Sequence, residues 1–294
     1  MKDLFPAVLS CFIVMFTCMP NPVFSQSPNT ISEDTARAAL LVRQGDTLCN
    51  VKNKCREALV PFDIADKIYQ QTGTTESYGY SEVMLNKGIA YTRVQKQDSG
   101  FICLKEAERL KRKFAPNSFR LSTTLTSLMP LYASQDLNIS LSLGNEAYTI
   151  QNQLLGEKNI WTNRTLNNIA ICHRLMGNLD KAIETYLKVL NNTSKEDLVL
   201  LAGVYGNLAN CYSDKGDANQ ALSHLLKAET RINKQTNLDI YLSCLINIGN
   251  AYRSKGEFNQ ALNYYNRVLA LLKEAPQYLM QLGTVYSCLG IMYK

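Results

Sequence analysis

The sequence predicts an all-α fold, a right-handed superhelical solenoid of antiparallel helix pairs. One pattern occurs three times: a ring-bearing residue is followed by a glycine and then by two small residues, always at the same spacing. The copies are His173, Gly177, Ala182 and Val189; Tyr212, Gly216, Ala221 and Ala228; and Tyr252, Gly256, Ala261 and Val268. They follow one another at 39 and 40 residues. Self-similarity at such a period is typical of stacked helical repeats.

Each copy predicts two helices joined by a tight turn. Around the second copy, apolar residues recur at three- and four-residue spacing on both sides of the segment 214–217, which is the spacing of a helix with one buried face. Gly216 interrupts the pattern, because glycine adopts the positive φ of a tight turn at little steric cost. Ala209 and Ala221 are small residues at the expected helix crossing, where a larger side chain would cost roughly 1–3 kcal/mol. Tyr212 is long enough to fill the space between the two helices.

These residues resemble the tetratricopeptide repeat family, with its pattern of a small residue, tyrosine, glycine and alanine. The good copies are Ala170, His173, Gly177 and Ala182; Ala209, Tyr212, Gly216, Ala221 and Ala228; and Gly249, Tyr252, Gly256, Ala261 and Val268. Weaker copies are Gly88, Tyr91, Gly100, Leu104 and Ala107; Met129, Tyr132 and Ala147; and Ala58, Phe62 and Ala65 after a first helix from Asp34 to Cys49. The resemblance covers nearly all of the chain after residue 34 and implies a scaffold that holds a partner.

Two features depart from the family pattern. The period is near 40 residues rather than the family's usual 34, so we expect helices or interhelical loops extended by about one turn. In this respect the chain resembles the long-repeat proteins of regulation and signalling. In the third unit Pro130 falls inside the expected first helix. Proline there should kink or break the helix, which would make this unit the main bend of the array.

The N-terminus predicts a secretory signal peptide. After Lys2, residues 7–19 are almost continuously apolar, residues 20–22 break the run, and Ser25 offers a small-residue cleavage site. The apolar run is shorter than the roughly 20 residues of a membrane span, although an uncleaved anchor remains an alternative. Lipidation at Cys18 is a third, which Phe16 and Thr17 do not favour.

The sequence therefore divides into a signal peptide at 1–25, a polar leader at 26–33 and a repeat array at 34–294. The array would hold six helix pairs plus the first helix of a seventh, which residues 289–293 match. An apolar helix face with no second helix to cover it invites association. We expect the chain to continue into a longer protein; the alternative is an end that docks on a partner.

Charge gives no sign of nucleic-acid binding. The formal net charge is +6 and is spread along the chain. The only dense basic run, residues 105–113, has no interleaved aromatic residue and is expected to be the solvated face of one helix.

Cysteines and histidines predict no catalytic, metal or cofactor site. Seven cysteines follow residue 25, an odd and scattered set that is not a disulfide framework. Cys49 and Cys55 alone flank a turn and could pair in an oxidising compartment, given a suitable geometry. Cys172 and Cys211 share one repeat position as small buried residues, and His173 is expected to pack in the core. No CxxC pair, P-loop, HExxH or GxSxG motif occurs, so the protein is predicted not to be an enzyme.

Amide side chains on the first helices form the candidate binding row. Residues one turn apart there should project into the concave face of the array, which is the usual binding surface of such stacks. The predicted partner-binding residues are Asn168, Asn207, Asn210, Asn247, Asn250, Arg174 and Arg253, and Asn86 and Arg93 take similar places in the second unit. Because an asparagine both donates and accepts, such a row can hold the backbone of an extended peptide. The alternative is an idle, solvated polar face.

One specialised version of this row is unsupported. Chaperone-binding members of the family clamp a terminal carboxylate with asparagines and basic residues. Asn210 and Asn247 match the asparagines, but Gly206, Thr284 and Cys288 stand where basic residues are needed.

The sequence thus predicts a non-catalytic scaffold for a protein or an extended peptide, exported to the periplasm, the envelope or the medium. The alternative is the exported sensing region of a longer membrane kinase or transcriptional regulator. No nucleic acid is expected as a partner. Membrane contact would come only through an uncleaved N-terminal segment or a C-terminal continuation.

Overall fold

The computed structural model describes residues 33–51, 54–235, 237–275 and 279–292. The predicted signal peptide and all but the last residue of the polar leader lie outside these residues. Every regular element in the described part is a helix, and consecutive helices pack as pairs. These observations confirm the all-α class and the helix pairing. The chain divides into two compact units, 1–156 and 157–294, which we call unit 1 and unit 2.

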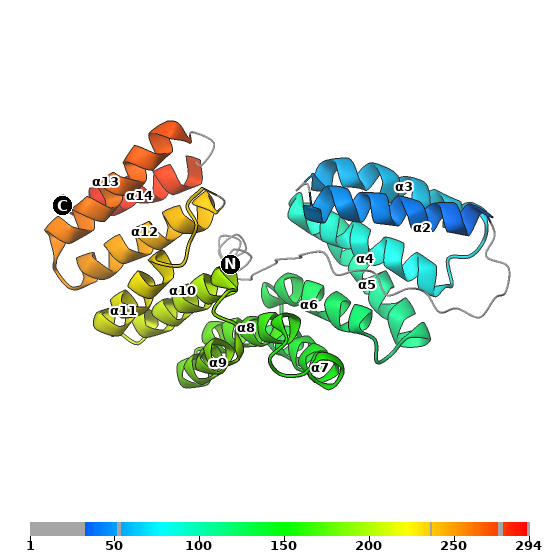
Figure 1. The fold of residues 1–294 in the computed structure, drawn as a ribbon, viewed down its shortest axis with the longest axis horizontal. Helices are drawn as coiled ribbons and strands as arrows, with labels where there is room; N and C mark the ends of the chain where they lie inside the picture. Colours follow the sequence, from blue (N-terminus) through cyan, green and yellow to red (C-terminus); the bar gives the residue numbers. More distant parts are fainter. Residues whose placement is uncertain (1–32, 52–53, 236, 276–278, 293–294) are drawn as a thin grey trace. The chain divides into compact units, whose positions relative to one another are not determined.

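The described part of unit 1 holds three helix pairs, whose α-helices are labelled in Figure 1. Its elements are α2 (Glu33–Asp46) with the short π-helix η1 (Thr47–Val51) and α3 (Cys55–Gln71); α4 (Tyr78–Arg93) and α5 (Gln97–Phe114); and α6 (Phe119–Ala133) and α7 (Leu137–Leu155). Within the unit, α3 packs against α4 and α5 against α6. The pairs therefore stack in chain order.

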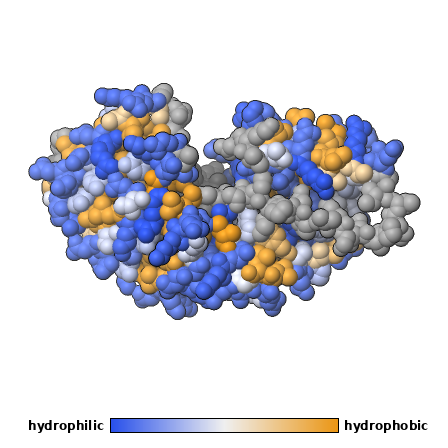
Figure 2. Space-filling view, in the orientation of Figure 1, coloured by the Kyte–Doolittle hydropathy of each residue, from blue (hydrophilic) through white to orange (hydrophobic). Residues whose placement is uncertain are grey.

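Unit 2 holds three further pairs and one more helix. Its elements are α8 (Ile160–Leu175) and α9 (Leu179–Asn192); α10 (Leu198–Asp214) and α11 (Ala218–Glu229); α12 (Leu238–Ser254) and α13 (Phe258–Glu274); and α14 (Leu279–Met292). Here α9 packs against α10, α11 against α12, and α13 against α14. On the face drawn in Figure 2 hydrophilic residues predominate, and apolar residues form separate patches.

The turns of unit 2 follow the glycine spacing. Gly177, Gly216 and Gly256 have φ values of 78°, 79° and 76°, a region that only glycine enters without steric cost. In the second of these turns the Asp217 amide donates to the Tyr212 carbonyl at 2.8 Å. The predicted helix–turn–helix units are confirmed at these three positions.

Unit 1 makes the equivalent turn without glycine. The positive φ, 63°, belongs to Gln95. Gly100, which the weak copy places at the glycine position, lies inside α5 instead. A Cβ atom there would lie 3.1 Å from the Gly88 carbonyl and 2.7 Å from the Thr92 side chain. Gly100 is therefore the small residue at the closest approach of α4 and α5, and the predicted role was wrong.

Pro130 does not break its helix. α6 continues through it and ends at Ala133. Only three residues of α6 follow Pro130, so the missing backbone donor and any bend affect just the end of the helix. The nearby Met129 carbonyl also accepts a hydrogen bond from the Ser140 hydroxyl of α7 at 2.8 Å. Packing against α7 thus supports this turn.

The basic run of residues 105–113 is only partly a solvated face. Lys111 is fully buried, forms an ion pair with Glu82 of α4 and donates to Ser81 Oγ at 3.0 Å. Arg120 Nε of α6 donates to the same carboxylate at 2.7 Å. Burial alone would raise the pKa of Glu82, but Arg120 and Lys111 lower it to about 2. Sequence missed this cluster because a helical period does not distinguish an inward lysine from an outward one.

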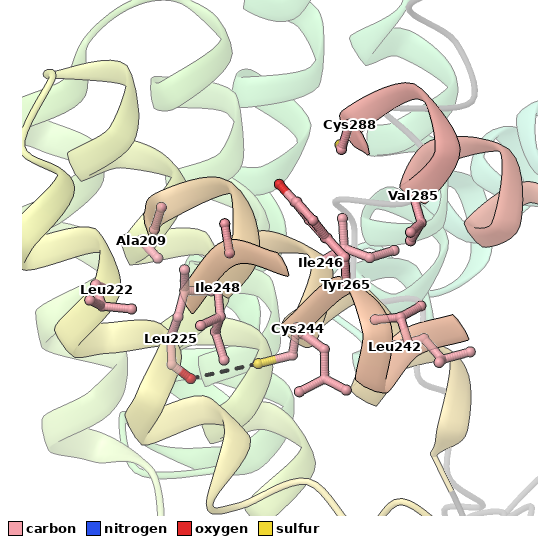
Figure 3. Close-up of a cluster of buried hydrophobic side chains, with 14 of the residues drawn as sticks. Ala209, Leu222, Leu225, Leu242, Cys244, Ile246, Ile248, Tyr265, Val285 and Cys288 are labelled. Carbon is pink, nitrogen blue, oxygen red and sulfur yellow. Dashed lines mark hydrogen bonds between the residues drawn. The ribbon is translucent and has the colours of Figure 1, made fainter. Parts of the chain in front are cut away.

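A continuous apolar cluster joins the successive helices α10 to α14 of unit 2 (Figure 3). Leu225 of α11, Leu242 and Ile248 of α12, Tyr265 of α13 and Val285 of α14 are almost completely buried. Each such aliphatic side chain contributes about 1.5–3 kcal/mol on leaving water. This cluster fixes the first helices of neighbouring pairs and so positions the polar residues that they present.

Candidate functional site: a groove on unit 2

Unit 2 carries a cavity of about 460 Å³ where α10, α11 and α12 meet. It is lined by Asn210, Ser213, Gly216, Ala218, Leu225, Asn247, Asn250, Ala251 and Ser254. Three of the seven predicted binding residues therefore come together in one groove. The lining consists of amides, hydroxyls and small apolar groups, and it includes no charged side chain.

The three amides of the groove are held differently. The Asn210 and Asn247 side chains are half-buried and have no side-chain hydrogen bond within the described residues. Asn250 Oδ1, by contrast, accepts from the Tyr265 hydroxyl at 2.8 Å and from Cys288 Sγ at 3.3 Å. Two amides are therefore available to a ligand on both their donor and acceptor sides, and the third on one side.

Asn168 and Asn207 do not line the groove. Both are buried, with exposed fractions of 2% and 7%. Asn207 Nδ2 donates to Asn167 Oδ1 at 3.2 Å, and Asn167 Nδ2 donates to Asn168 Oδ1 at 3.3 Å. These amides satisfy one another between α8 and α10, because a buried polar group without a partner costs free energy. The prediction that they face a partner is corrected here.

The two predicted arginines also differ. Arg174 forms an ion pair with Asp214, with Nη1 and Oδ2 2.7 Å apart. Burial raises the pKa of Tyr265 to about 12, and the nearby positive charge of Arg253 opposes that rise. No carboxylate among the described residues forms an ion pair with Arg253. Neither arginine is among the residues that line the groove.

Sequence reasoning missed Tyr265, Cys288 and the groove hydroxyls of Ser213 and Ser254. Tyr265 lies between Ala261 and Val268 on the buried stripe of α13, so the sequence pattern indicates a core residue and not a groove residue. Its hydroxyl reaches the groove only because α12 and α13 cross where Gly249 leaves room: a Cβ atom there would lie 2.5 Å from the tyrosine ring. The small-residue position of the repeat was the one signal that could have indicated this contact.

The histidines lie in half-buried or buried positions. His224 is 8% exposed and stacks on Tyr212 with ring centroids 5.3 Å apart. Burial lowers the pKa of His224, and nearby Lys227 lowers it further. Burial likewise lowers the pKa of His173. Within the described residues, histidine, cysteine and carboxylate side chains form no group suited to hold a metal ion.

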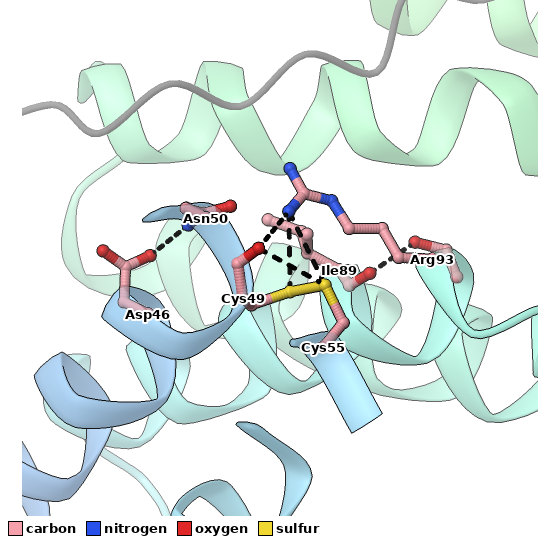
Figure 4. The surroundings of a disulfide bond; sticks show 7 residues. Asp46, Cys49, Asn50, Cys55, Ile89 and Arg93 are labelled. Atoms are coloured by element: carbon pink, nitrogen blue, oxygen red, sulfur yellow. Dashed lines mark hydrogen bonds between the residues drawn. A yellow bond between two sulfur atoms is a disulfide. The ribbon is translucent and has the colours of Figure 1, made fainter. Parts of the chain in front are cut away.

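In unit 1, Cys49 and Cys55 form a disulfide, with Cα atoms 4.1 Å apart (Figure 4). The pairing that the sequence left open is therefore present. Both cysteines are buried, and Arg93 Nη1 donates to the Cys49 carbonyl at 3.0 Å. The same nitrogen lies 3.5 Å from the sulfur of Cys49 and 3.7 Å from that of Cys55. Arg93 thus joins the C-terminal end of α4 to the bridge.

The remaining described cysteines are buried and form no disulfide. They are Cys103, Cys172, Cys211, Cys244 and Cys288. Burial raises the pKa of Cys211 and of Cys244 to about 12, so these thiols are neutral at ordinary pH. This agrees with their predicted role as small apolar groups. In addition, no helix of the described chain combines the length and hydropathy that crossing a bilayer requires.

Comparison with known proteins agrees with this architecture. The model of the tetratricopeptide repeat family matches residues 131–195 and 200–274. The structure is similar to the apo form of the quorum sensor NprR from B. thuringiensis, with 16% identity, a TM-score of 0.74, and coverage of 87% of this chain and 70% of that one. No curated protein matches the sequence significantly.

Two further solved structures share the fold. NprR in complex with its cognate peptide NprX has 15% identity and a TM-score of 0.67, covering 90% of this chain and 74% of that one. A Rap protein complexed with Competence and Sporulation Factor has 13% identity and a TM-score of 0.66, covering 85% and 80%. Together with the observed helix pairs and turn glycines, these similarities identify residues 131–195 and 200–274 as tetratricopeptide repeats.

Proposed function

We propose that this protein is a non-catalytic scaffold that binds an extended peptide or protein segment in the groove of unit 2. The single observation that carries the proposal is the convergence of Asn210, Asn247 and Asn250 on one groove, with two of the amides unpaired. Amides without an internal partner hydrogen-bond to a peptide backbone without desolvating a charge. Similarity to NprR, whose structure is known with its cognate peptide NprX, supports the same assignment.

A non-catalytic role follows from the chemistry of the lining. Amides and hydroxyls supply hydrogen bonds, whereas proton transfer in catalysis uses groups that titrate near neutral pH. The groove residues are of the first kind. The partner is accordingly held and not transformed.

The binding proposal is tested with the triple variant Asn210→Ala, Asn247→Ala, Asn250→Ala. Peptides that the wild type selects from a random display library serve as the probe. At about 1 kcal/mol for each hydrogen bond, affinity should fall by roughly two orders of magnitude, while the helical circular dichroism stays unchanged. Asn263→Ala, an exposed asparagine of α13 outside the groove, is the matched control and should bind normally.

Asn207→Ala separates the groove from the buried amides. It leaves Asn167 without its partner, so it should lower stability by about 1–3 kcal/mol and leave the affinity of the folded protein unchanged. Wild-type affinity in the triple variant would contradict the proposed groove.

We also propose that the protein is exported. The signal-peptide pattern of residues 1–25 and a disulfide between buried cysteines are both typical of chains that mature in an oxidising compartment. N-terminal sequencing of the mature protein should give Gln26 as the first residue. A mature chain that keeps Met1 and has free thiols at Cys49 and Cys55 would contradict export.

A second candidate is the exported sensing region of a longer signalling protein. The observation that favours it is the similarity to NprR, a quorum sensor of which this chain covers 70%. Sequencing the reading frame beyond Lys294 distinguishes the two functions. A following membrane helix with a kinase or DNA-binding module supports the sensing region, and an early stop codon supports the free scaffold.

A further inference from the structure

A buried tyrosine of α13 holds the side-chain amide of Asn250. The Tyr265 hydroxyl donates to Asn250 Oδ1, 2.8 Å away, and an amide oxygen can only accept. A hydrogen bond in such a buried position is stronger than one exposed to water.

Cys288 of α14 fixes the same oxygen from a second side. Its Sγ lies 3.3 Å from Asn250 Oδ1, and a thiol is a better donor than acceptor. Figure 3 shows Tyr265 and Cys288 on neighbouring helices of the buried cluster. Tyr265 is fully buried and Cys288 is 8% exposed. Two buried donors on Oδ1 leave Nδ2 as the part of the Asn250 amide that can face the groove.

The preceding repeat lacks this arrangement. Leu225 stands 40 residues before Tyr265, on the matching face of α11, and has no hydroxyl. Asn210, 40 residues before Asn250, has no side-chain partner in the described chain. The two asparagines share a repeat position but differ in freedom: Asn250 is held in one orientation, and Asn210 can rotate.

We infer that Asn250 is a fixed hydrogen-bond donor of the groove, positioned by Tyr265 and Cys288. The ligand group at this point is then a hydrogen-bond acceptor, the main-chain carbonyl of an extended segment. Asn210 and Asn247 can rotate to match the peptide donors and acceptors on either side of that carbonyl. The uncharged lining matches an uncharged stretch of peptide. This inference rests on the proposed function and adds the polarity of one contact and the residues that determine it.

The isosteric change Asn250→Asp tests the polarity. Aspartate keeps the acceptor that Tyr265 and Cys288 contact but presents a second acceptor to the groove in place of the donor. Affinity for the display-selected peptide should fall roughly tenfold or more at neutral pH. Asn263→Asp, which introduces the same charge at an exposed asparagine of α13 outside the groove, is the matched control and should change affinity less than about threefold. Equal losses in the two variants, or none at Asn250, would overturn the inference.

Tyr265→Phe tests the positioning. It should weaken binding roughly fivefold, whereas Tyr286→Phe, which removes the same hydroxyl from an exposed tyrosine of α14, should have no effect. Cys288→Ser keeps the donor and should bind like the wild type, while Cys288→Ala should bind more weakly. Rescue by serine distinguishes hydrogen bonding from simple packing.

A measurement without any ligand keeps the inference separate from the proposed function. Nuclear magnetic resonance of the free protein reports whether the side-chain amide of Asn250 holds one orientation, through contacts of its Nδ2 protons. We expect the Asn250 amide to hold one orientation in the wild type and to average between orientations in Tyr265→Phe. The Asn210 amide should average in both proteins. An Asn250 amide that already averages in the wild type refutes the inference even if peptides bind. If the Asn250 amide is fixed but the protein binds no peptide, the proposed function is refuted and the inference about the amide is not.

Discussion

Unit 1 and unit 2 pack helix pairs of one kind, but different side chains lie between their helices. In unit 1, Lys87 reaches from α4 to two carboxylates of α3, Asp63 and Asp66, at 2.8 and 2.7 Å. The buried Glu82 joins α4 to α5 and α6 through Lys111 and Arg120. In unit 2 a buried interhelical polar contact is formed by two amides, Asn207 and Asn167, while the ion pairs Arg174–Asp214 and Arg267–Glu229 are partly exposed.

The same repeat position illustrates the difference. Asn86 of α4 is buried and donates to the Glu82 carbonyl within its own helix at 2.8 Å. Asn247 of α12 has no such bond and lines a cavity. At this position the amide of α4, a helix held by buried charges, is internal, whereas the amide of α12, a helix held by apolar contacts, is available. The four predictions below test this division, from the largest expected effect to the smallest.

Removing the buried carboxylate should destabilise unit 1 most. Glu82→Ala leaves Lys111 and Arg120 with no compensating charge, and breaking a buried pair in this way costs about 3–5 kcal/mol. Hydrogen exchange, read separately over the two units, should show the loss in residues 33–156. Glu76→Ala removes the exposed partner of Arg109 and Lys113 and should change little. Equal effects of the two variants would mean that burial does not matter here.

Acid should affect unit 1 through the same group. Glu82 titrates near its ordinary value of 4.5 in the unfolded chain and at about 2 in the folded one. The folded pKa is lowered, so the stabilisation is complete above pH 4.5 and is lost as the pH falls toward 2. The linked free energy is about 3 kcal/mol. Urea unfolding across this range should show the loss in the wild type and a weaker dependence in Glu82→Gln. Identical pH profiles would contradict the assignment.

Opening the disulfide should also act on unit 1. The bridge closes a short loop, since its cysteines are six residues apart, and the chain-entropy model gives about 2 kcal/mol for a loop of this size. The double variant Cys49→Ser, Cys55→Ser should lose that much stability in α2 and α3. Cys172→Ser, which changes a buried cysteine of unit 2 that forms no disulfide, controls for the substitution itself. A loss spread evenly over both units would count against separate stabilisation.

The smallest effect concerns the turns. Gln95 holds the positive φ that glycine holds in unit 2, and this conformation costs a non-glycine residue about 1 kcal/mol. Gln95→Gly should therefore raise the urea midpoint of unit 1 without changing the slope, and Gly216→Ala should lower that of unit 2. A lower midpoint for Gln95→Gly would show that its side chain stabilises the turn by more than the backbone conformation costs.

Much of the fold could be predicted because the residues that determine the turn and the helix crossing of each pair recur at a fixed spacing. The turn glycines at 177, 216 and 256 and the small residues at Ala182, Ala221 and Ala261 act within a single helix pair, over a few residues. Gly100 and Pro130 were misjudged because their roles depend on a neighbouring helix, Gly100 at a crossing and Pro130 in a turn supported from α7. Those neighbours are not visible in a helical period.

The sequence alone determined the helix pairs, their order and the row of amides, because the spacing of apolar and small residues defines which face each helix buries. Only the tertiary structure decided which amides are available. The Asn207 side chain donates a hydrogen bond to Asn167, whereas the Asn247 side chain lines a cavity. The physical reason is that a side chain's hydrogen-bond partner usually lies on another helix, and which two helices approach closely depends on the packing of the whole unit.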